Sequence, residues 1–328
     1  MPANLPPQYF EAEKAYKAAS TPEQKIEALE AMLAIMPHHK GTDKLRAELR
    51  ARIARYSSEA QRRPSTGKRG NIYDIKKEGA GQVVVVGLPN SGKSQLVSAL
   101  SGATLEISDY PFTTKSPTPA MMRFQNVQIE LVDLPPVTDR EARPWLPRLL
   151  KNADAMLIVV DLSNDPLGQM EIVLRELQEM KVRPLGNSVM PETAIGVVQK
   201  KASIIANKAD VPGAGDNYQK LNSAYGDDFS VIAISAREGK NLDAAKSGIF
   251  EVLEVIRVYT RPPGKKPDFD GPTVLKKGSA IGDFAGSIHK DFRVKLRYAQ
   301  VWGSGKFEGQ RVGKDHVLAD GDVVELHV

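Results

Sequence analysis

A glycine-rich run that begins at Gly87 has the pattern G-x-x-x-x-G-K-S, which is typical of loops that bind nucleotide phosphates. The run reads Gly87-Leu88-Pro89-Asn90-Ser91-Gly92-Lys93-Ser94, with an apolar strand pattern before it and a helix pattern from Gln95 onward. Glycines let backbone N–H groups wrap phosphates, and the helix N-terminus adds its dipole. We expect Lys93 to reach the β- and γ-phosphates and Ser94 to bind Mg²⁺. The plainer alternative is that Gly87 and Gly92 only mark a tight turn.

A second polar run, Asn207-Lys208-Ala209-Asp210, indicates which base the nucleotide carries. It follows an apolar strand pattern, and doubly wound sheets bind ligands at the carboxyl ends of their strands. The carboxylate of Asp210 can accept hydrogens from both N1 and N2 of guanine, whereas adenine offers no matching donors. We expect Asn207 and Lys208 to hold the loop and to stack along the base. The pair of motifs predicts GTP and GDP as ligands.

Three further positions complete the expected site. Asp133 ends the apolar strand pattern Ile129-Glu-Leu-Val-Asp133, where a carboxylate can support Mg²⁺. The run Tyr110-Pro-Phe-Thr-Thr-Lys115 offers a threonine for Mg²⁺ and the γ-phosphate, and we favour Thr114 over Thr113. Ser235-Ala236 could present a backbone amide to guanine O6. We expect catalysis to depend on Lys93 and Thr114.

The elements that must position these residues form an alternation of short β-branched strands and helix patterns from residue 82 to residue 254. Such an alternation, with continuous apolar strands, predicts an α/β fold whose doubly wound, mostly parallel sheet is covered on both faces. Candidate strands are 82–87, 117–124, 127–133, 155–161, 202–207 and 229–234, and candidate helices lie near 93–101, 167–180 and 241–254. Residues 117–124 and 127–133 could form one antiparallel pair.

The two flanks differ from this middle part. Residues 21–56 have helical spacing, with a break at Pro37 to Gly41, and predict a helical hairpin with Lys44, Arg46, Arg50, Arg52 and Arg55 on its surface. Residues 57–70 are polar and aperiodic, which predicts a linker. Beyond Arg261-Pro-Pro-Gly264, short strand-like segments at 272–275, 292–297 and 322–328, and a helix near 282–290, suggest a β-grasp-like domain. The expected parts are 1–70, 71–258 and 259–328.

Composition restricts the class of protein. The chain of 328 residues has no cysteine, which excludes disulfides and thiolate metal sites, and no apolar run approaches the ~20 residues that span a bilayer. We therefore expect a cytoplasmic protein without a membrane partner. Residues 40–77 hold twelve Lys or Arg and four Asp or Glu, which favours an anionic partner such as RNA, although charged runs often only solvate a helix face.

The order of these motifs resembles the Obg-related GTPases, and within them most closely the developmentally regulated GTP-binding proteins. The similarity continues in Arg257-Val-Tyr-Thr-Arg-Pro262, Tyr298-Ala-Gln-Val-Trp-Gly303 and Val312-Gly-Lys-Asp-His316, which look like their C-terminal TGS domain. The resemblance implies a P-loop GTPase domain, a TGS domain with a β-grasp fold, and association with the ribosome or RNA. Residues 161–201 are too few for the insertion domain of those proteins, so the chain looks like a shorter, prokaryotic-type relative.

Two departures from that family bear on hydrolysis. Pro136 stands where the Asp-x-x-Gly motif of the family has glycine, and Val137 stands where many small GTPases have a glutamine that orients water. Asn90 lies at the P-loop position that helps bind K⁺ in some related GTPases. The alternative role for Asn90 is that it only caps the loop.

Three functions are compatible with these residues. The first is a GTP-binding protein that hydrolyses GTP slowly and associates with ribosomes or structured RNA. The second is a GTP-binding scaffold with little or no hydrolysis, because Pro136 and Val137 remove expected features. An ATP-dependent small-molecule kinase is disfavoured by Asp210. The sequence gives no indication of the oligomeric state.

Overall fold

The computed structural model describes residues 7–18, 22–36, 42, 45–53, 75–103, 116–186 and 196–328. It divides into two compact units, Met1–Asn71 and Ile72–Val328. The linker expected at 57–70 and the threonine expected to sense the γ-phosphate, Thr114, lie outside the described residues. In the part of the chain that is described, no helix combines the length and the apolar character needed to cross a bilayer.

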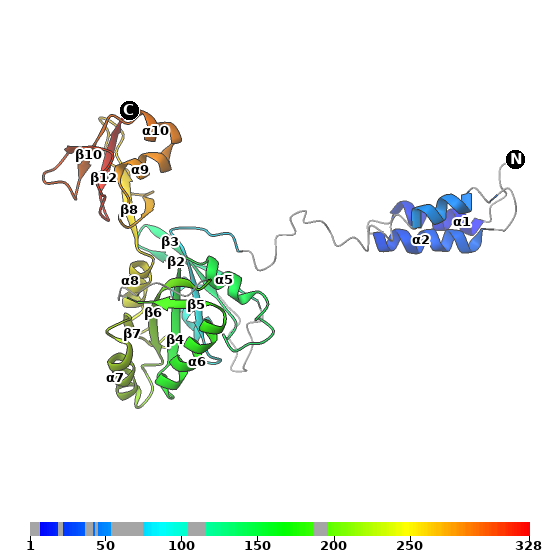
Figure 1. The fold of residues 1–328 in the computed structure, drawn as a ribbon, viewed down its shortest axis with the longest axis horizontal. Helices are drawn as coiled ribbons and strands as arrows, with labels where there is room; N and C mark the ends of the chain where they lie inside the picture. The colour runs from blue at the N-terminus through cyan, green and yellow to red at the C-terminus, as the bar shows by residue number, and fades with distance from the viewer. Residues whose placement is uncertain are drawn as a thin grey trace. The chain divides into compact units, whose positions relative to one another are not determined.

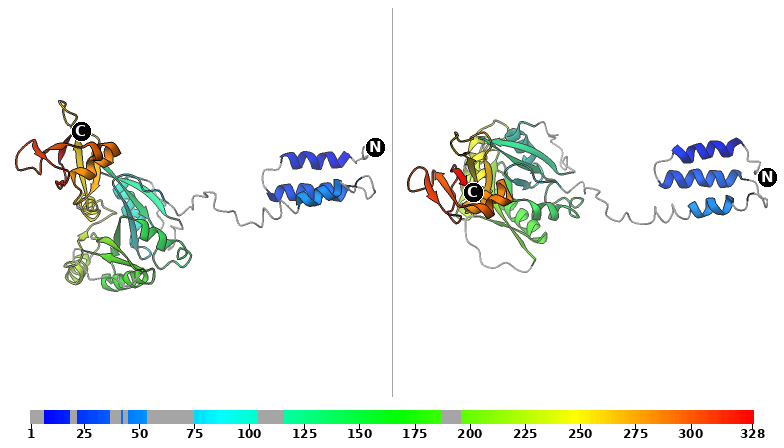
Figure 2. Two further views of the ribbon diagram at one scale, coloured as in Figure 1. Left: turned by 45° about the horizontal axis from the view of Figure 1, so that its top comes forward. Right: turned by 90° about the horizontal axis from the view of Figure 1, so that it is seen from above.

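The first unit is built from helices that share one small core. Helix α1 spans Pro7–Ala18, α2 spans Pro22–Ile35, and residues 45–53 are also helical (Figure 2). Their buried apolar side chains form one cluster: Tyr9, Leu29, Met32, Met36 and Leu49. The hairpin predicted for 21–56 therefore gains a preceding helix. Periodicity did not reveal α1, because its inward residues are Tyr9, Ala12 and Tyr16 rather than leucines.

Arg46 corrects one expectation for this unit. The sequence placed it on the basic surface, but its side chain is buried and its Nη1 donates a hydrogen bond to the carbonyl O of Met36 at 2.8 Å. A buried guanidinium needs such a partner. Arg50 and Arg52 are exposed, as expected.

The second unit contains a seven-stranded sheet within its described residues (Figure 1). The strand order is β2-β3-β1-β4-β6-β5, and β7 also pairs with β6. All pairs are parallel except β2 with β3, the antiparallel pair that the sequence predicted. The strands are β1 Gln82–Gly87, β2 Thr118–Phe124, β3 Val127–Asp133, β4 Ala155–Asp161, β5 Val182–Leu185, β6 Val198–Asn207 and β7 Val231–Ala233.

Helices cover both faces of this sheet, because successive side chains of its central strands point to opposite sides. Val84 and Val86 pack in one core cluster with α5, α6 and α7, and Val83 and Val85 pack in another with α4 and α8. The helices are α4 Lys93–Ser101, α5 Leu146–Asn152, α6 Pro166–Glu179, α7 Ala214–Tyr225 and α8 Leu242–Val252. The doubly wound arrangement expected from the sequence is confirmed.

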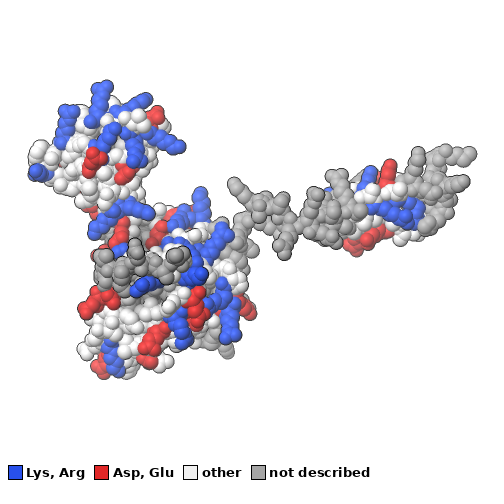
Figure 3. Space-filling model, viewed as in Figure 1, with Lys and Arg blue, Asp and Glu red and all other residues white. Residues whose placement is uncertain are grey.

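The remaining residues form a five-stranded sheet in the order β11-β10-β12-β8-β9. Its strands are β8 Val255–Thr260, β9 Thr273–Lys276, β10 Tyr298–Trp302, β11 Gln310–Val312 and β12 Val323–His327, and its helices are α9 Ile281–Ile288 and α10 Lys290–Lys295. Phe284 of α9 is fully buried against the sheet, together with Val258 and Val301. On the face seen in Figure 3, Lys and Arg side chains predominate over this part of the chain.

One strand prediction in this part was wrong. Residues 292–297 were expected to be extended, but residues 290–295 form α10, and the strand follows at β10. The short run Phe292-Arg-Val-Lys-Leu-Arg alternates apolar and charged residues, which is the strand pattern. His289 overrides it, since its Nδ1 accepts a hydrogen bond from the amide of Asp291 and caps a helical turn.

Candidate functional site

The glycine-rich loop lies between the end of β1 and the start of α4, at the carboxyl edge of the larger sheet. Gly92, the residue before α4, has φ +88°, a left-handed conformation that favours glycine. A Cβ atom on Gly92 would lie 2.2 Å from Nδ2 of Asn207. The first turn of α4 therefore meets the Asn207 loop more closely than any side chain at position 92 would allow.

Lys93 is buried in this loop, with 6% of its surface exposed. Its Nζ donates to the carbonyl O of Leu88 at 2.9 Å. Burial lowers the pKa of Lys93 to about 8, and the charge of Asp133 only partly opposes that shift. A phosphate placed in the loop would supply the negative charge that this ammonium lacks.

The two described residues expected at Mg²⁺ lie in contact. Asp133 ends β3 and is almost fully buried, and its Oδ2 accepts a hydrogen bond of 2.5 Å from Oγ of Ser94. A hydroxyl and a carboxylate at this distance can support one cation together with phosphate oxygens and water, the arrangement that Mg²⁺ prefers. The third expected residue, Thr114, lies outside the described part.

Asn207 joins the two halves of the candidate site. It is fully buried, its Nδ2 donates to the carbonyl O of Ser91 at 3.1 Å, and its Oδ1 accepts from the amide of Ala236 at 3.0 Å. The phosphate loop and the Ser235-Ala236 loop are thus held by one side chain. The sequence predicted that Ser235-Ala236 could present a backbone amide to guanine O6, and in this structure the amide of Ala236 donates to Asn207.

Asp210 lies beside this junction with one oxygen unused. Its Oδ1 is buried and has no hydrogen-bond partner within the described residues. A hydrogen bond with the hydroxyl of Ser235 lowers the pKa of Asp210, which keeps the carboxylate ionised at neutral pH. A buried, ionised acceptor without a partner is costly, so its presence indicates a missing donor.

Asp161 is a residue of the site that the sequence reasoning missed. Lys208 has φ +65°, and its Nζ pairs with Oδ2 of Asp161 at 2.6 Å. Asp161 ends β4, the neighbour of β6, so the pair fixes the side chain of Lys208 across the carboxyl edge of the sheet. The signal was available, because Asp161, like Asp133, is an aspartate that ends an apolar strand.

The segment after Asp133 turns into the core rather than toward solvent. Leu134 and Val137 are fully buried, and the amide of Val137 donates to the carbonyl O of Gly87 at 3.3 Å. Val137 therefore offers neither a polar side chain nor a free amide to the loop. Asn90, in contrast, is exposed and adopts φ +59°. Its side chain is therefore accessible to an ion at the edge of the glycine-rich loop.

The residues present fit a guanine nucleotide with Mg²⁺. The loop offers backbone N–H groups at the start of α4, Ser94 and Asp133 offer a hydroxyl and a carboxylate, and the orphaned oxygen of Asp210 offers the acceptor for guanine. The site positions that the sequence predicted, and that are described, lie along the P-loop and at the ends of the neighbouring strands. These are Gly87, Leu88, Pro89, Asn90, Ser91, Gly92, Lys93, Ser94, Gln95, Asp133, Asn207, Lys208, Asp210, Ser235 and Ala236.

Two family models match the chain in the order expected from its motifs. The model described as "50S ribosome-binding GTPase" matches residues 82–201, and the model of the TGS domain matches residues 256–328. These matches cover the larger sheet as far as β6 and the whole of the second sheet.

The relatives extend over nearly the whole chain. A GTP-binding protein of Methanocaldococcus jannaschii, itself described as uncharacterized, is 30% identical over 93% of this chain and 92% of its own length. Developmentally-regulated GTP-binding protein 1 of Xenopus laevis is 29% identical over 92% of this chain and 98% of that protein. Ribosome-interacting GTPase 1 of Saccharomyces cerevisiae is 27% identical over 94% of this chain and 99% of that protein.

The alignment with the M. jannaschii relative runs over 368 positions, more than the 328 residues of this chain, so the relative contains segments that this chain lacks. The chain nevertheless contains both parts, with the match to the GTPase model before the match to the TGS model. It belongs to the family of developmentally regulated GTP-binding proteins, P-loop GTPases with a C-terminal TGS domain.

Proposed function

We propose that this protein binds GTP and GDP with Mg²⁺ at the site described above, associates with ribosomes or structured RNA, and hydrolyses GTP slowly. In this proposal the run from Gly87 to Gln95 holds the phosphates, and Asp210 recognises guanine. Ser94, Asp133 and Thr114 support Mg²⁺. The parts 1–70, 71–258 and 259–328 act as a basic helical segment, a GTPase domain and a TGS domain.

The observation that carries guanine recognition is the buried, ionised oxygen of Asp210 without a partner. Asp210→Asn replaces that acceptor by an amide, and charge-assisted bonds contribute ~1.5–3 kcal/mol each. We expect at least a tenfold loss of GTP affinity and a shift toward xanthosine triphosphate. Asp216→Asn, an exposed aspartate on α7, is the control and should bind GTP as the wild type does. Equal affinity of the wild type for ATP and GTP would end the proposal.

Ribosome association is supported by two independent features. A relative is named Ribosome-interacting GTPase 1, and the family model that matches residues 82–201 is described by ribosome binding. Residues 40–77 carry an excess of eight positive charges, which suits the phosphates of RNA. We place the protein in the cytoplasm on the same grounds.

Slow hydrolysis is favoured by Val137, which stands where many small GTPases have a glutamine that orients water. Phosphoryl transfer depends on positioning and charge stabilisation, and Val137 is buried and apolar. A K⁺ ion held by Asn90 beside the phosphates would supply the missing positive charge. Single-turnover hydrolysis should then be faster in KCl than in NaCl, and Asn90→Ala should abolish the difference. Equal hydrolysis rates of the wild type in KCl and NaCl would indicate that Asn90 only stabilises the conformation of the loop.

The second candidate is a GTP-binding scaffold with little or no hydrolysis. The burial of Val137 and its bond to Gly87 favour it, because both keep the segment after Asp133 away from the γ-phosphate. If the protein hydrolyses GTP no faster than GTP decays in buffer, in either KCl or NaCl, the protein is a GTP-binding scaffold.

A further inference from the structure

Lys208, in the loop expected to recognise guanine, has an uncommon backbone conformation and a fixed side chain. Its φ of +65° is left-handed, which residues other than glycine seldom adopt. Such conformations persist only where the surrounding structure holds them, and they cluster at ligand sites. The backbone after Lys208 is held by the amide of Ala209, which donates to the carbonyl O of Ile234 at 2.9 Å. The side chain is held by the carboxylate of Asp161.

Asp161 uses both of its carboxylate oxygens in this contact region. Its Oδ2 accepts a hydrogen bond of 2.6 Å from Nζ of Lys208. Its Oδ1 accepts from the amide and the hydroxyl of Ser163, at 2.8 and 2.6 Å. Only 14% of the side chain of Asp161 is exposed, so salt and water weaken the ion pair less than they weaken a surface pair. The carboxylate therefore fixes where the ammonium of Lys208 lies.

Asp161 is itself held by its neighbours. The side chain of Gln169, on α6, accepts from the amide of Asp161 at 2.9 Å and donates to its carbonyl O at 2.8 Å. The amide of Leu162 donates to the carbonyl O of Asn207 at 2.9 Å, which ties the end of β4 to the end of β6. Groups supported in this way by strands and helices hold a site in one geometry. The carboxylate of Asp161 is thus presented to Lys208 from a supported position.

We propose that Asp161 is a positioning residue for nucleotide binding, which acts through Lys208. The proposal rests on the proposed recognition of guanine by this loop. A free lysine side chain loses much rotamer freedom when a ligand orders it, so holding its ammonium in advance lowers the cost of binding. The stem of Lys208 then packs along one face of the base, while Asp210 bonds to the edge of the base. Asp161 consequently affects affinity, and Asp210 affects the choice of base.

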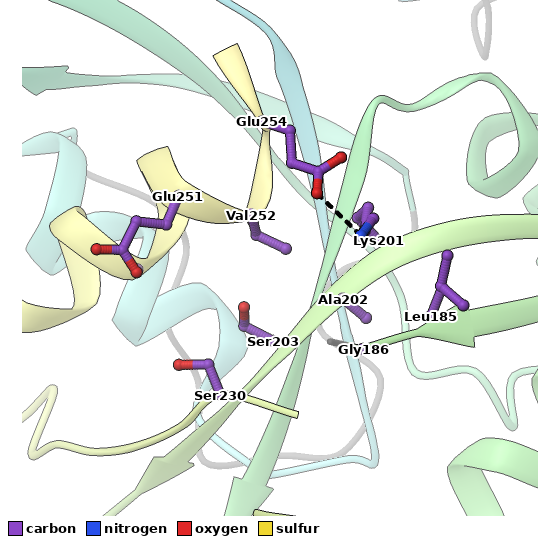
Figure 4. A pocket seen from close by; sticks show the side chains of 10 residues that line it. Leu185, Gly186, Lys201, Ala202, Ser203, Ser230, Glu251, Val252 and Glu254 are labelled. Atoms are coloured by element: carbon purple, nitrogen blue, oxygen red, sulfur yellow. Dashed lines mark ion pairs between the residues drawn. The ribbon is translucent and has the colours of Figure 1, made fainter. Parts of the chain in front are cut away.

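A second ion pair of the same sheet provides a matched control. Lys201, also on β6, pairs with Glu254 at 2.9 Å beside a cavity of about 80 Å³ (Figure 4). This pair lies toward the amino end of β6, whereas Asp161 and Lys208 meet at its carboxyl end. Glu254→Gln therefore removes the carboxylate partner of a lysine without touching the nucleotide site.

The test compares Asp161→Asn with Glu254→Gln. Asparagine keeps an acceptor for Ser163 but loses the charge that holds Lys208. Binding of methylanthraniloyl derivatives of GDP and of the β,γ-imido analogue of GTP is measured by fluorescence. For a partly exposed, charge-assisted pair, we expect Asp161→Asn to lose about three- to tenfold in affinity for both nucleotides, through faster dissociation. Glu254→Gln should bind both nucleotides as the wild type does.

A double-mutant cycle distinguishes an action through Lys208 from general support of the loop. Lys208→Met removes the ammonium and keeps an unbranched stem. In the Lys208→Met background, Asp161→Asn should cause no further loss of affinity. Lys208→Ala removes the stem as well and should bind more weakly than Lys208→Met. In the Asp210→Asn background, Asp161→Asn should reduce affinity for the xanthosine analogue by the same factor.

The contrary outcomes can be told apart. If the wild type prefers GTP to ATP but Asp161→Asn binds as tightly as Glu254→Gln, the positioning role is wrong and guanine recognition stands. If Asp161→Asn loses as much affinity with Met at position 208 as with Lys, Asp161 only supports the loop and the proposal is wrong. Equal binding by Lys208→Ala and Lys208→Met would exclude packing of the stem on the base. Equal affinity of the wild type for ATP and GTP would overturn guanine recognition and this inference with it.

Discussion

The ammonium of Lys93 donates to a backbone carbonyl rather than to a carboxylate. Its ammonium bonds to Leu88, and its pKa falls to about 8 because burial outweighs the charge of Asp133. The lowered pKa means that the charge of the lysine is less stable in the loop than in water, and a bound anion would stabilise it. Triphosphate binding should restore the charge and take up a proton wherever the lysine has lost one.

This gives a pH prediction with a definite sign. Above about pH 8 the free protein binds GTP only with proton uptake, so affinity should fall by up to about tenfold per pH unit toward about pH 9. In the unfolded chain the lysine keeps its proton up to its ordinary pKa of 10.5, so this group makes folding more favourable as the pH rises from about 8 to 10.5. Calorimetry in buffers of different ionisation enthalpy measures the uptake. A constant affinity from about pH 7 to about pH 9 would contradict the shift.

Pro136 supplies a second prediction at the residue scale. Glycine in the Asp-x-x-Gly position of the family offers an amide to the γ-phosphate, whereas proline has none. The next amide, that of Val137, already bonds to Gly87 at 3.3 Å. We expect hydrogen exchange across residues 133–140 to be similar with GDP and with a non-hydrolysable GTP analogue. Pro136→Gly should introduce a difference. Strong protection of the wild type by the analogue alone would show that this segment still responds.

At the scale of elements, local pattern predicted the strands that carry the site. The candidate strand 82–87 and the helix 93–101 match β1 and α4, and 127–133 and 155–161 match β3 and β4. Strands β1 and β4 are buried, mostly apolar runs flanked by motif residues. The order of the motifs then placed Asp133 and Asn207 at one edge of the sheet, because the carboxyl ends of parallel strands meet there.

Elements with weaker patterns were missed for identifiable reasons. Helix α7 contains Gly215 and few apolar residues, and only Ala214 and Leu221 are buried, so no apolar stripe marks it. Strand β5 has four residues and contains Pro184. Proline lacks the N–H group that a central strand needs, so the sequence pattern does not predict a strand there. In the site, the orphaned oxygen of Asp210 and the bridge made by Asn207 depend on residues far apart in the chain, which periodicity cannot place.

Arg257 of β8 connects the second sheet to the β2–β3 turn. Its guanidinium bonds to Asp320 through Nε at 3.0 Å and Nη2 at 2.6 Å, and to the side chain of Gln125. It also lies over the ring of Phe250, 5.0 Å from its centre. Asn126 of the same turn donates to the hydroxyl of Tyr259 at 2.5 Å. The hairpin that ends at Asp133 is therefore anchored at its far end by the TGS domain.

Loss of this anchor should destabilise the junction. Arg257→Ala removes several hydrogen bonds, two of them to the carboxylate of Asp320, which is itself about a third exposed, and we expect a loss of about 1–3 kcal/mol. Arg311→Ala is the control, because it removes an exposed arginine that only stacks on Tyr298, which contributes about 0.5–1 kcal/mol. Urea unfolding measures both. Equal losses would mean that Arg257 is no more than a surface residue.

At the scale of the whole molecule, we propose that a guanine-specific site is linked to the binding of RNA. Basic residues occur in residues 40–77 and in the TGS part. We expect association with the ribosome to depend on which nucleotide fills the proposed site, and exchanging Asp210 changes the base that this site accepts.

The most direct test is co-sedimentation with ribosomes, with the base specificity exchanged. The wild type should pellet with the β,γ-imido analogue of GTP and remain in solution with the corresponding xanthosine analogue. Asp210→Asn should show the reverse preference, which excludes a general loss of folding as the cause. Pelleting that is the same for both proteins with either nucleotide would contradict the account, because ribosome association would then be independent of the guanine site.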